Sequence, residues 1–282
     1  MTSNELFQIT KNLLWSELRV DLDGSDLKKD LTTELIIKNN KKITAHIVNK
    51  EKLVFCGGLL IKNFLNENFS EILVEVNFKD GEKVKRNSKL ISLSGNAKLI
   101  LTTERTILNF LQHLCSISTE THKFVSKVKN YKTKILDTRK TTTGLRKLEK
   151  YATSIGGAIN HRFGLYDDVL IKDNHIKIVG GVDKLIKILK KKSIKNYKVE
   201  CDKLSQVQKC IEAGANYILL DNMKPNQVKK IINSNFKSAV FEVSGGIDIS
   251  NISKYAKVGA HFISTSKITV CAKPVDISLD LI

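Results

Sequence analysis

The chain has 282 residues, of which 41% are hydrophobic, 27% charged and 6% aromatic. This composition is ordinary for a globular protein and argues against wholesale disorder, while the length allows one or two domains with a sizeable core. The 47 lysine and arginine residues against 29 acidic ones give a formal net charge of +18. Such an excess favours nucleic acid, an acidic membrane or anionic small molecules as partners.

The charge excess also has a neutral explanation. It is mostly lysine, in a chain that is rich in Ile and Asn and has only two prolines, as compositional drift of a genome would give. A nucleic-acid-binding protein would place its lysines on one face with aromatic residues between them. Here aromatic residues are few and the lysines are dispersed. We therefore favour drift and expect no nucleic-acid partner, keeping a basic nucleic-acid-binding protein as the non-enzyme alternative.

The cysteines and the apolar runs indicate a cytoplasmic protein. The five cysteines form no CxxC pair and have no histidine at zinc-site spacing, which is typical of reduced thiols. No apolar run approaches the roughly 18 residues that a membrane span needs. Residues 1–19 lack the apolar core of a secretory signal. We expect neither a membrane partner nor a structural metal bound by cysteine.

The first hundred residues predict an α+β unit. Residues 5–19 have the spacing of an amphipathic helix, with Leu6, Ile9 and Leu13 on one side. Gly57-Gly58 and Asp80-Gly81 are typical of turns. Short β-rich runs lie around these turns, and the predicted strands are 34–38, 43–48, 53–55, 72–76 and 89–92. Strands that follow strands, with few helices, indicate this class.

The pattern changes after residues 100–129, which predict one long helix or two. From there strands and helices alternate, in units of about 20–25 residues that are typical of βα repeats. The predicted strands are 133–137, 168–172, 197–201, 217–221, 239–243 and 261–264. The predicted helices are 145–155, 182–192, 204–213, 225–233 and 250–257.

This alternation fits either an open doubly wound sheet or a βα barrel. No GxGxxG follows a strand, which weakens the dinucleotide-binding sheet. Glu200, Asp221 and Ser244 each end a predicted strand, and polar residues at strand ends are a feature of barrel active sites. We therefore favour a barrel, one short of eight strands because only six or seven units fit.

Basic residues gather between residues 137 and 176, in DTRKTTTGLRKLEKYATSIGGAINHRFGLYDDVLIKDNHI. They flank predicted strands, where they can converge on one point. Arginine matches a carboxylate through two parallel hydrogen bonds, while lysine is a compact point charge. A substrate with carboxylates, phosphates or both is the leading hypothesis; the alternative is pairing with Glu149, Asp167, Asp168 or Asp173. The basic residues are Arg139, Lys140, Arg146, His161, Arg162 and Lys172.

Two carboxylates and two small-residue loops complete the candidate site. Glu200 and Asp221 could serve Mg²⁺ or a positive charge developing on a sugar carbon, or could pair with the basic residues instead. The loops Ser244-Gly245-Gly246 and Ser264-Thr265-Ser266 follow late strands, where barrels frequently bind phosphate. Ordinary turns also use such residues. Together these groups outline phosphoribosyl transfer to an acidic heterocycle.

Specific motifs carry a resemblance to a known family. They are TTERTILNFLQHLCSISTET, DTRKTTTGLRKLEKYA, GGAINHRFGLYDDVLIKDNHI, VECDKL, ILLDNM, EVSGGI and GAHFIST, which cover most of residues 100–282. DLTTELI, FCGG and DGEKV extend the match more loosely into the first hundred residues. The chain resembles the quinolinate phosphoribosyltransferases, also called carboxylating nicotinate-nucleotide pyrophosphorylases.

The resemblance implies a fold and an activity. It implies an α/β protein in which an N-terminal α+β sandwich domain, residues 1–112, precedes an incomplete (β/α) barrel, residues 113–269, with the tail 270–282 joining the first domain. It implies that phosphoribosyl pyrophosphate reacts with quinolinate in the presence of Mg²⁺, giving nicotinate mononucleotide, pyrophosphate and CO₂. It also implies a homodimer. The alternative is a paralogous enzyme that uses another acidic acceptor.

The resemblance also assigns roles to residues. Arg105 would be donated across the dimer, Lys140, Glu200 and Asp221 would be catalytic, and both carboxylates would meet Mg²⁺, largely through water and pyrophosphate. The quinolinate-binding residues would be Arg105, Thr138, Arg139, Lys140, His161, Arg162 and Lys172. The phosphate-binding residues would be Ser244, Gly245, Gly246, Ser264, Thr265 and Ser266.

The chain departs from the family's pattern at three positions. Thr143 stands where the family usually has proline, Ala158 where it has glycine, and Ser266 where the last phosphate loop usually has glycine. The first departure could loosen its loop, and the third bears on how closely the backbone can approach a phosphate. None of them removes a charged residue of the predicted site.

Overall fold

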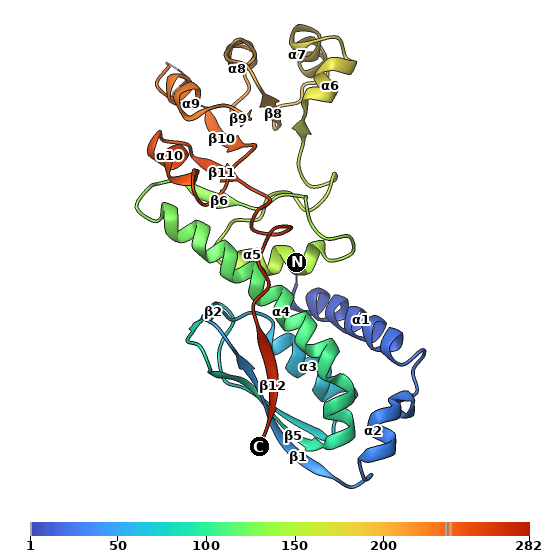
Figure 1. Ribbon diagram of the computed structural model, residues 1–282. Coiled ribbons are helices and arrows are strands. Elements are labelled where there is room, and N and C mark those ends of the chain that lie inside the picture. The colour runs from blue at the N-terminus through green and yellow to red at the C-terminus, as the bar shows by residue number, and fades with distance from the viewer. Residues whose placement is uncertain (1, 235, 237–238) are drawn as a thin grey trace. The chain divides into compact units, whose positions relative to one another are not determined.

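The computed structural model describes residues 2–234, 236 and 239–282 (Figure 1). The chain divides into two compact units, and each unit contains separate stretches of the sequence. Unit 1 comprises Met1–Glu120, Gly144–Gly156 and Ala272–Ile282. Unit 2 comprises Thr121–Thr143 and Gly157–Cys271. The segment 144–156 therefore belongs with the N-terminal residues, although the chain on both sides of it belongs to unit 2.

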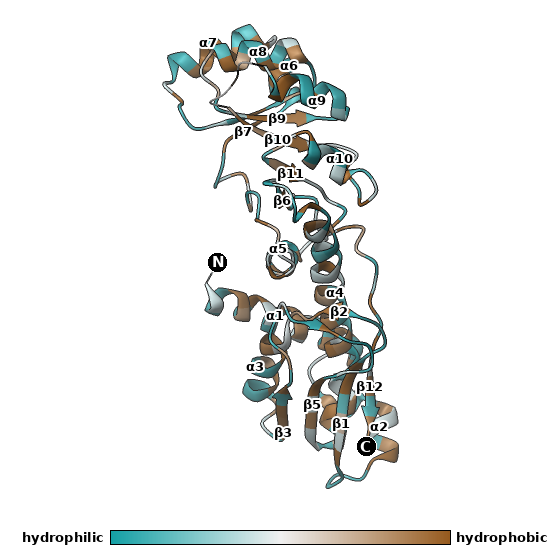
Figure 2. Cartoon of the chain, turned by 90° about the vertical axis from the view of Figure 1, so that its left-hand side faces the viewer, coloured by the Kyte–Doolittle hydropathy of each residue, from teal (hydrophilic) through white to brown (hydrophobic). Residues whose placement is uncertain are grey.

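The helix at the start of unit 1 is α1 (Ser3–Asp21), which confirms the helix predicted over residues 5–19. It begins where the Thr2 hydroxyl accepts the backbone N–H of Glu5 at 3.2 Å, a capping contact that satisfies one of the free donors of the first turn. Leu6, Leu14 and Leu18 are buried along one side. Figure 2 shows α1 coloured both hydrophilic and hydrophobic, as an amphipathic helix should be.

The main sheet of unit 1 is antiparallel. Its order is β12 (Ile277–Leu281), β1 (Lys42–Asn49), β5 (Lys89–Asn96) and β3 (Ile72–Val76). A separate pair joins β2 (Leu53–Val54) to β4 (Lys83–Val84). The strands predicted over 43–48, 53–55, 72–76 and 89–92 are thereby confirmed.

Two helices of unit 1 lie where the sequence predicted a strand and a turn. The strand predicted over 34–38 is wrong, because residues 31–36 form α2 (Leu31–Ile36) after a short 3₁₀ turn, η1 (Leu27–Lys29). The Asp30 carboxylate accepts the N–H of Thr33 at 3.1 Å, and this N-cap starts a helix despite the β-branched residues. Gly57-Gly58, interpreted as a turn, instead begins the unpredicted helix α3 (Gly58–Asn68).

Two further helices of unit 1 follow β5 in the sequence. The prediction over residues 100–129 is confirmed as a single helix, α4 (Ala97–Val128). Helix α5 (Arg146–Ile155) confirms the helix predicted over 145–155, and its side chains contact other elements of unit 1. Tyr151 donates to Asp80 Oδ2 at 2.6 Å, and Glu149 Oε1 lies 3.0 Å from His113 Nε2.

Unit 2 contains one six-stranded parallel sheet. Its order is β6 (Lys134–Leu136), β11 (Phe262–Ser264), β10 (Val240–Ser244), β9 (Tyr217–Asp221), β8 (Lys198–Cys201) and β7 (Leu170–Ile171). The first strand of the unit thus pairs with the last one, as in a barrel, whereas β6 and β7 are not paired within the described residues. The predicted strands are confirmed, and the arrangement confirms an α/β barrel short of eight strands.

Helices follow the strands of unit 2, and four of the five were predicted. They are α7 (Val182–Lys191), α8 (Leu204–Glu212), α9 (Pro225–Ile232) and α10 (Ile252–Lys257). The fifth, α6 (Asp173–Ile178), is a short helix directly after β7 that the sequence pattern did not indicate. In Figure 1 the helices α7 to α10 lie beside the strands β8 to β11 that they connect.

Alternation along the strands separates the two faces of this sheet. One face carries residues such as Val199, Ile218 and Val243, which are buried in the hydrophobic core of the unit. Figure 2 shows β9 and β10 as mostly hydrophobic. Residues one position away point to the other face, because successive side chains of a strand alternate. That second face includes Glu200 and Asp221, so the strands position their polar residues together.

The cysteines lie in both units. All five cysteines are free, and four of them are buried. Among the residues that the structure describes, no helix is both long enough and apolar enough to cross a membrane.

Candidate active site

A cavity of about 560 Å³ opens at the carboxyl ends of the strands of unit 2. This volume is within the usual range for small-molecule sites. Every site residue that was predicted in unit 2 lines the cavity. They are Thr138, Arg139, Lys140, His161, Arg162, Lys172, Glu200, Asp221, Ser244, Gly245, Gly246, Ser264, Thr265 and Ser266. The cavity thus brings together residues that are far apart in the sequence.

The wall of the cavity is rich in positive charge. Of the residues that line it, five are lysine or arginine and three are carboxylates. Arg139 has a buried Nε that makes no hydrogen bond within the described part of the chain. A buried donor without an acceptor is costly, and a charged one more so. An acceptor supplied by a bound anion would satisfy it.

Lys172 and Glu200 form an ion pair at the cavity, with Lys172 Nζ 3.0 Å from Glu200 Oε2. The Lys172 side chain is 48% exposed and that of Glu200 12% exposed. Lys172 and Glu200 therefore form an ion pair within the protein, which is the alternative to substrate binding that the sequence left open. Asp168 pairs instead with Lys198, and Asp173 with Lys177.

Buried Asp137 joins two of the loops that form the cavity. Its Oδ1 accepts the backbone N–H of His161 and its Oδ2 accepts the side-chain amide of Asn160, both at 2.7 Å. Asp137 directly follows β6, while His161 belongs to a loop more than twenty residues later. Thr138 accepts the backbone N–H of Lys140 at 3.0 Å. These contacts set the backbone from which Arg139 and Arg162 extend.

The two small-residue loops are held to each other and to the sheet. The Thr265 hydroxyl donates to the Ile247 carbonyl at 2.9 Å, and its backbone N–H donates to the Leu136 carbonyl at 3.2 Å. Both donors of Thr265 are thus used inside the protein. Gly245 has a φ of +88°, and a Cβ there would lie 2.2 Å from Asn222 Oδ1, so this position accepts only glycine without strain.

Asp221 and Glu200 come from neighbouring parallel strands. Asp221 ends β9 opposite Ser244 of β10, and its Oδ2 accepts the Asn222 side-chain amide at 2.7 Å. Among the described residues no group of three or more His, Cys, Asp or Glu side chains is arranged to hold a metal ion. A divalent cation held here would therefore take most of its ligands from outside the protein.

Arg105 and Arg146 do not line this cavity. Both belong to unit 1, Arg105 on α4 and Arg146 at the start of α5. Arg105 is exposed. Burial raises the pKa of the neighbouring Glu104, and the charge of Arg105 opposes this only in part.

Three polar residues of the cavity were not predicted from the sequence: Glu242, Asn222 and Lys267. Glu242 had a signal, because it is a charged residue inside the otherwise apolar strand VFEVS and shares a face with Ser244. Asn222 has a φ of +54°, a conformation that is uncommon for residues other than glycine but that asparagine adopts more readily than most. Lys267 directly follows the predicted Ser264–Ser266 loop.

Family models match both parts of the chain. The model for the quinolinate phosphoribosyl transferase C-terminal domain matches residues 117–280, and the model for the N-terminal domain matches residues 30–115. The first of these alone spans more than half of the chain.

Individual relatives agree with the family models. Two relatives are named "Probable nicotinate-nucleotide pyrophosphorylase (carboxylating)". The protein from Methanocaldococcus jannaschii is 40% identical over 264 residues, which cover 90% of this chain and 92% of that one. The protein from Bacillus subtilis is 38% identical over 260 residues, which cover 89% of this chain and 88% of that one. The solved structure of the nicotinate-nucleotide pyrophosphorylase from Francisella tularensis is 37% identical, with a TM-score of 0.89, over 98% of this chain and 97% of that one. The chain therefore belongs to the quinolinate phosphoribosyltransferase family.

Proposed function

We propose that this chain transfers the phosphoribosyl group of phosphoribosyl pyrophosphate to quinolinate and releases pyrophosphate and CO₂, giving nicotinate mononucleotide in NAD biosynthesis. The observation that carries this proposal is the cavity itself, in which cationic side chains, two strand-end carboxylates and two small-residue loops meet. The names of the relatives agree with it.

The acceptor would be held by the cationic side chains. Quinolinate carries two adjacent carboxylates, so it needs several donors to offset the loss of its hydration. Arg139 offers a buried Nε without an acceptor, and Arg162 and Lys172 lie along the same wall. Lys172 would exchange its contact with Glu200 for one with the substrate, which leaves Glu200 able to face the ribose.

The donor substrate would occupy the remaining part of the cavity. The loops at Ser244–Gly246 and Ser264–Ser266 would receive the 5′-phosphate through small residues that allow close approach. Glu200 and Asp221 would meet a magnesium pyrophosphate. Mg²⁺ needs only one or two protein carboxylates when water and phosphate oxygens supply its other ligands, so this pair fits that ion. Bound Mg²⁺ would neutralise charge on the leaving pyrophosphate.

Catalysis would depend on position and electrostatics. The two substrates are anions that repel each other in water, and the cationic wall with Lys140 would bring them together. The ring nitrogen displaces pyrophosphate at the sugar carbon, where Glu200 and Asp221 would stabilise the developing positive charge. The quaternised nitrogen then draws electrons from the adjacent carboxylate, which leaves as CO₂. This loss needs no dedicated general base.

We further propose that the chain works as a homodimer, with Arg105 of one subunit completing the site of the other. Arg105 is exposed and does not line the cavity of unit 2, which is compatible with a role outside its own site. This assignment follows the family resemblance around TERT.

The test is an assay with quinolinate, phosphoribosyl pyrophosphate and Mg²⁺, following nicotinate mononucleotide and CO₂. We expect equal amounts of both products, and no product with nicotinate as the acceptor. In Arg139→Ala the KM for quinolinate should rise about 10- to 100-fold, since a hydrogen bond to a charged group contributes about 1.5–3 kcal/mol. Activity with another acid and none with quinolinate would contradict the proposal.

A further inference from the structure

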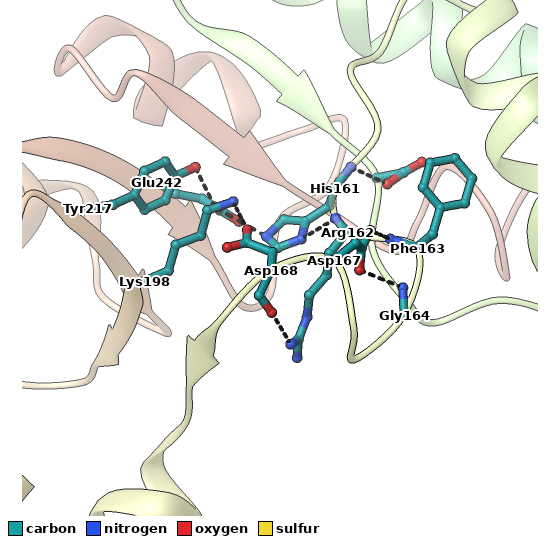
Figure 3. A network of polar contacts seen from close by, with 10 residues as sticks. His161, Arg162, Phe163, Gly164, Asp167, Asp168, Lys198, Tyr217 and Glu242 are labelled. Atoms are coloured by element: carbon teal, nitrogen blue, oxygen red, sulfur yellow. Dashed lines mark hydrogen bonds and ion pairs between the residues drawn. The ribbon is translucent and has the colours of Figure 1, made fainter. Parts of the chain in front are cut away.

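The buried polar network beneath the cavity contains His161 and Glu242, whose side chains are 7% and 0% exposed. In Figure 3 the His161 ring lies between the Glu242 carboxylate and the backbone of Arg162. Both residues also line the cavity. Burying a charge is costly unless partners compensate for it, and Glu242 has no assigned role toward either substrate. The contacts of Glu242 should therefore explain why this carboxylate is buried.

The His161 ring is fixed in one tautomer by its neighbours. Its Nδ1 accepts the backbone N–H of Arg162 at 2.8 Å, so Nδ1 must carry a lone pair. The proton of the neutral ring is therefore on Nε2, and Nε2 lies 3.5 Å from Glu242 Oε2. An imidazolium would place a proton at Nδ1 against the Arg162 N–H, which is unfavourable.

Glu242 is held as an acceptor for this ring. Its Oε2 also accepts the Tyr217 hydroxyl at 2.7 Å. Burial opposes the ionised form of Glu242 and raises its pKa, whereas the hydrogen bonds that the carboxylate accepts from His161, Ser264 and Tyr217 favour that form and lower the pKa. The carboxylate thus remains ionised and continues to attract the proton on His161 Nε2.

The network ends at a residue that was predicted to bind the acceptor. The backbone N–H that His161 accepts is that of Arg162, and the Arg162 guanidinium donates from Nη1 to the Asp168 carbonyl at 3.0 Å. The orientation of Arg162 at the cavity is therefore set at both its backbone and its side chain. Losing the His161 contact would release one of these two restraints.

We propose that Glu242 is a positioning residue, which keeps His161 in the neutral Nε2–H tautomer so that His161 holds Arg162 toward the acceptor carboxylates. His161 then acts through Arg162 rather than as a cationic ligand of the substrate. The role of Arg162 in this proposal rests on the proposed function, whereas the tautomer of His161 does not.

The first test uses the unliganded wild-type protein and ¹⁵N NMR of the His161 ring, assigned by comparison with His161→Gln. We expect the signature of a neutral ring protonated at Nε2 at pH 7. An imidazolium signature, or a proton on Nδ1, would overturn the proposal whatever the protein catalyses. This measurement requires neither a folded variant at Glu242 nor enzymatic activity.

The second test is Glu242→Gln, which removes the negative charge that attracts the proton on His161 Nε2. We expect the ring signature to change accordingly and the KM for quinolinate to rise about tenfold, the effect of losing one ordinary hydrogen bond, with the KM for phosphoribosyl pyrophosphate unchanged within about twofold. The matched control is Tyr217→Phe, which removes a different hydrogen bond of the same carboxylate. It should change the ring signature and the quinolinate KM less than Glu242→Gln does, because the negative charge that faces Nε2 remains.

Two outcomes decide the second test. A folded Glu242→Gln variant with an unaltered ring signature and unaltered quinolinate KM would sink the proposal. Equal losses for both substrates in Glu242→Gln and Tyr217→Phe would show a merely structural role. A wild-type protein with the expected tautomer but no quinolinate activity would instead contradict the proposed function, so the two failures are distinguishable.

Discussion

Arg139 and Lys172 line the same cavity but are held in different ways. Within the part of the chain that the structure describes, the buried Arg139 Nε has no acceptor, whereas Lys172 is half exposed and already has a carboxylate partner in Glu200. A ligand carboxylate would add a new contact at Arg139 but would exchange one contact for another at Lys172. We therefore expect substitutions at these two positions to differ in what they do to folding and to binding.

Substituting Lys172 by alanine should hardly alter stability. Ion pairs near the surface contribute about 0–1 kcal/mol, so the free energy of unfolding should change by no more than about 1 kcal/mol in urea titrations. The kcat/KM for quinolinate should fall at least about tenfold, because a charged donor to the substrate is lost.

Lys177→Ala is a suitable control for that experiment. Lys177 pairs with Asp173 at 3.1 Å, is 72% exposed and does not line the cavity. It should leave both stability and kcat/KM unchanged. If Lys172→Ala instead lost several kcal/mol of stability with little effect on kcat/KM, its role would be structural.

At the scale of elements, Asp80 connects two helices of unit 1. Its carboxylate accepts the backbone N–H groups of Gly57 and Gly58, at 2.9 and 3.2 Å, where α3 begins. It also accepts the Tyr151 hydroxyl of α5 at 2.6 Å. One carboxylate thereby caps the first turn of α3 and secures α5, whose N-terminal end directly follows the loop that carries Arg139.

Removing the Tyr151 hydroxyl should destabilise the protein. We expect Tyr151→Phe to lower the free energy of unfolding by about 1.5–3 kcal/mol, since the lost hydrogen bond is to a charged group. Burial, reinforced by Asp80, raises the pKa of Tyr151 far above its usual value. Because this folded-state pKa is raised, the contribution should be fully present below about pH 10, the pKa of an unfolded tyrosine, and decline above it.

The measurement is urea unfolding of both proteins between pH 7 and pH 10.5. The difference between wild type and Tyr151→Phe should be constant at the lower pH values and should narrow at the highest. Tyr131→Phe is the control, because Tyr131 is exposed and carries no such contact among the interactions that the structure describes. A difference that grew with rising pH would contradict the assignment.

The sequence predicted regular elements well and tertiary contacts poorly. The βα repeats of unit 2 were predictable because apolar strands and amphipathic helices have different periods. The residues at the strand ends were predictable for the same reason, since parallel strands bring their carboxyl ends to one edge. A strand was wrongly predicted in place of helix α2, because its β-branched residues indicated a strand more strongly than Asp30 indicated an N-cap. The Glu242–His161 contact was not predictable, because it depends on where the loop that carries His161 lies relative to β10.

At the scale of the whole molecule, the proposed dimer makes a prediction about mixed subunits. Arg105→Ala and Lys172→Ala should each be nearly inactive alone. If Arg105 acts across the dimer, a mixed dimer contains one site in which both residues are intact. Mixing the two variants should therefore restore up to about one quarter of the wild-type activity, assuming random exchange into dimers.

Subunit exchange must be shown separately, with two affinity tags that co-purify after mixing. The control mixes Lys172→Ala with Arg139→Ala, two changes in the same unit 2 cavity. Each site of that mixed dimer contains one damaged cavity residue, so this mixture should regain no activity. A second comparison mixes the Arg105→Ala, Lys172→Ala double variant with wild type, where a shared site would leave the mixed dimer without any intact site. No recovery in the first mixture despite proven exchange would contradict a shared site.

The position of β12 in the chain has a consequence for how the protein is made. This strand covers the edge of β1 in unit 1, yet it follows every strand of unit 2 in the sequence. A ribosome extends the chain from its N-terminus, and early domains generally fold first. A nascent chain that already contains β11 still has a bare edge on β1, with unpaired backbone donors and acceptors that invite wrong partners. Translation thus leaves the first unit unfinished until the second has been synthesised, and that interval is when a chaperone would matter most.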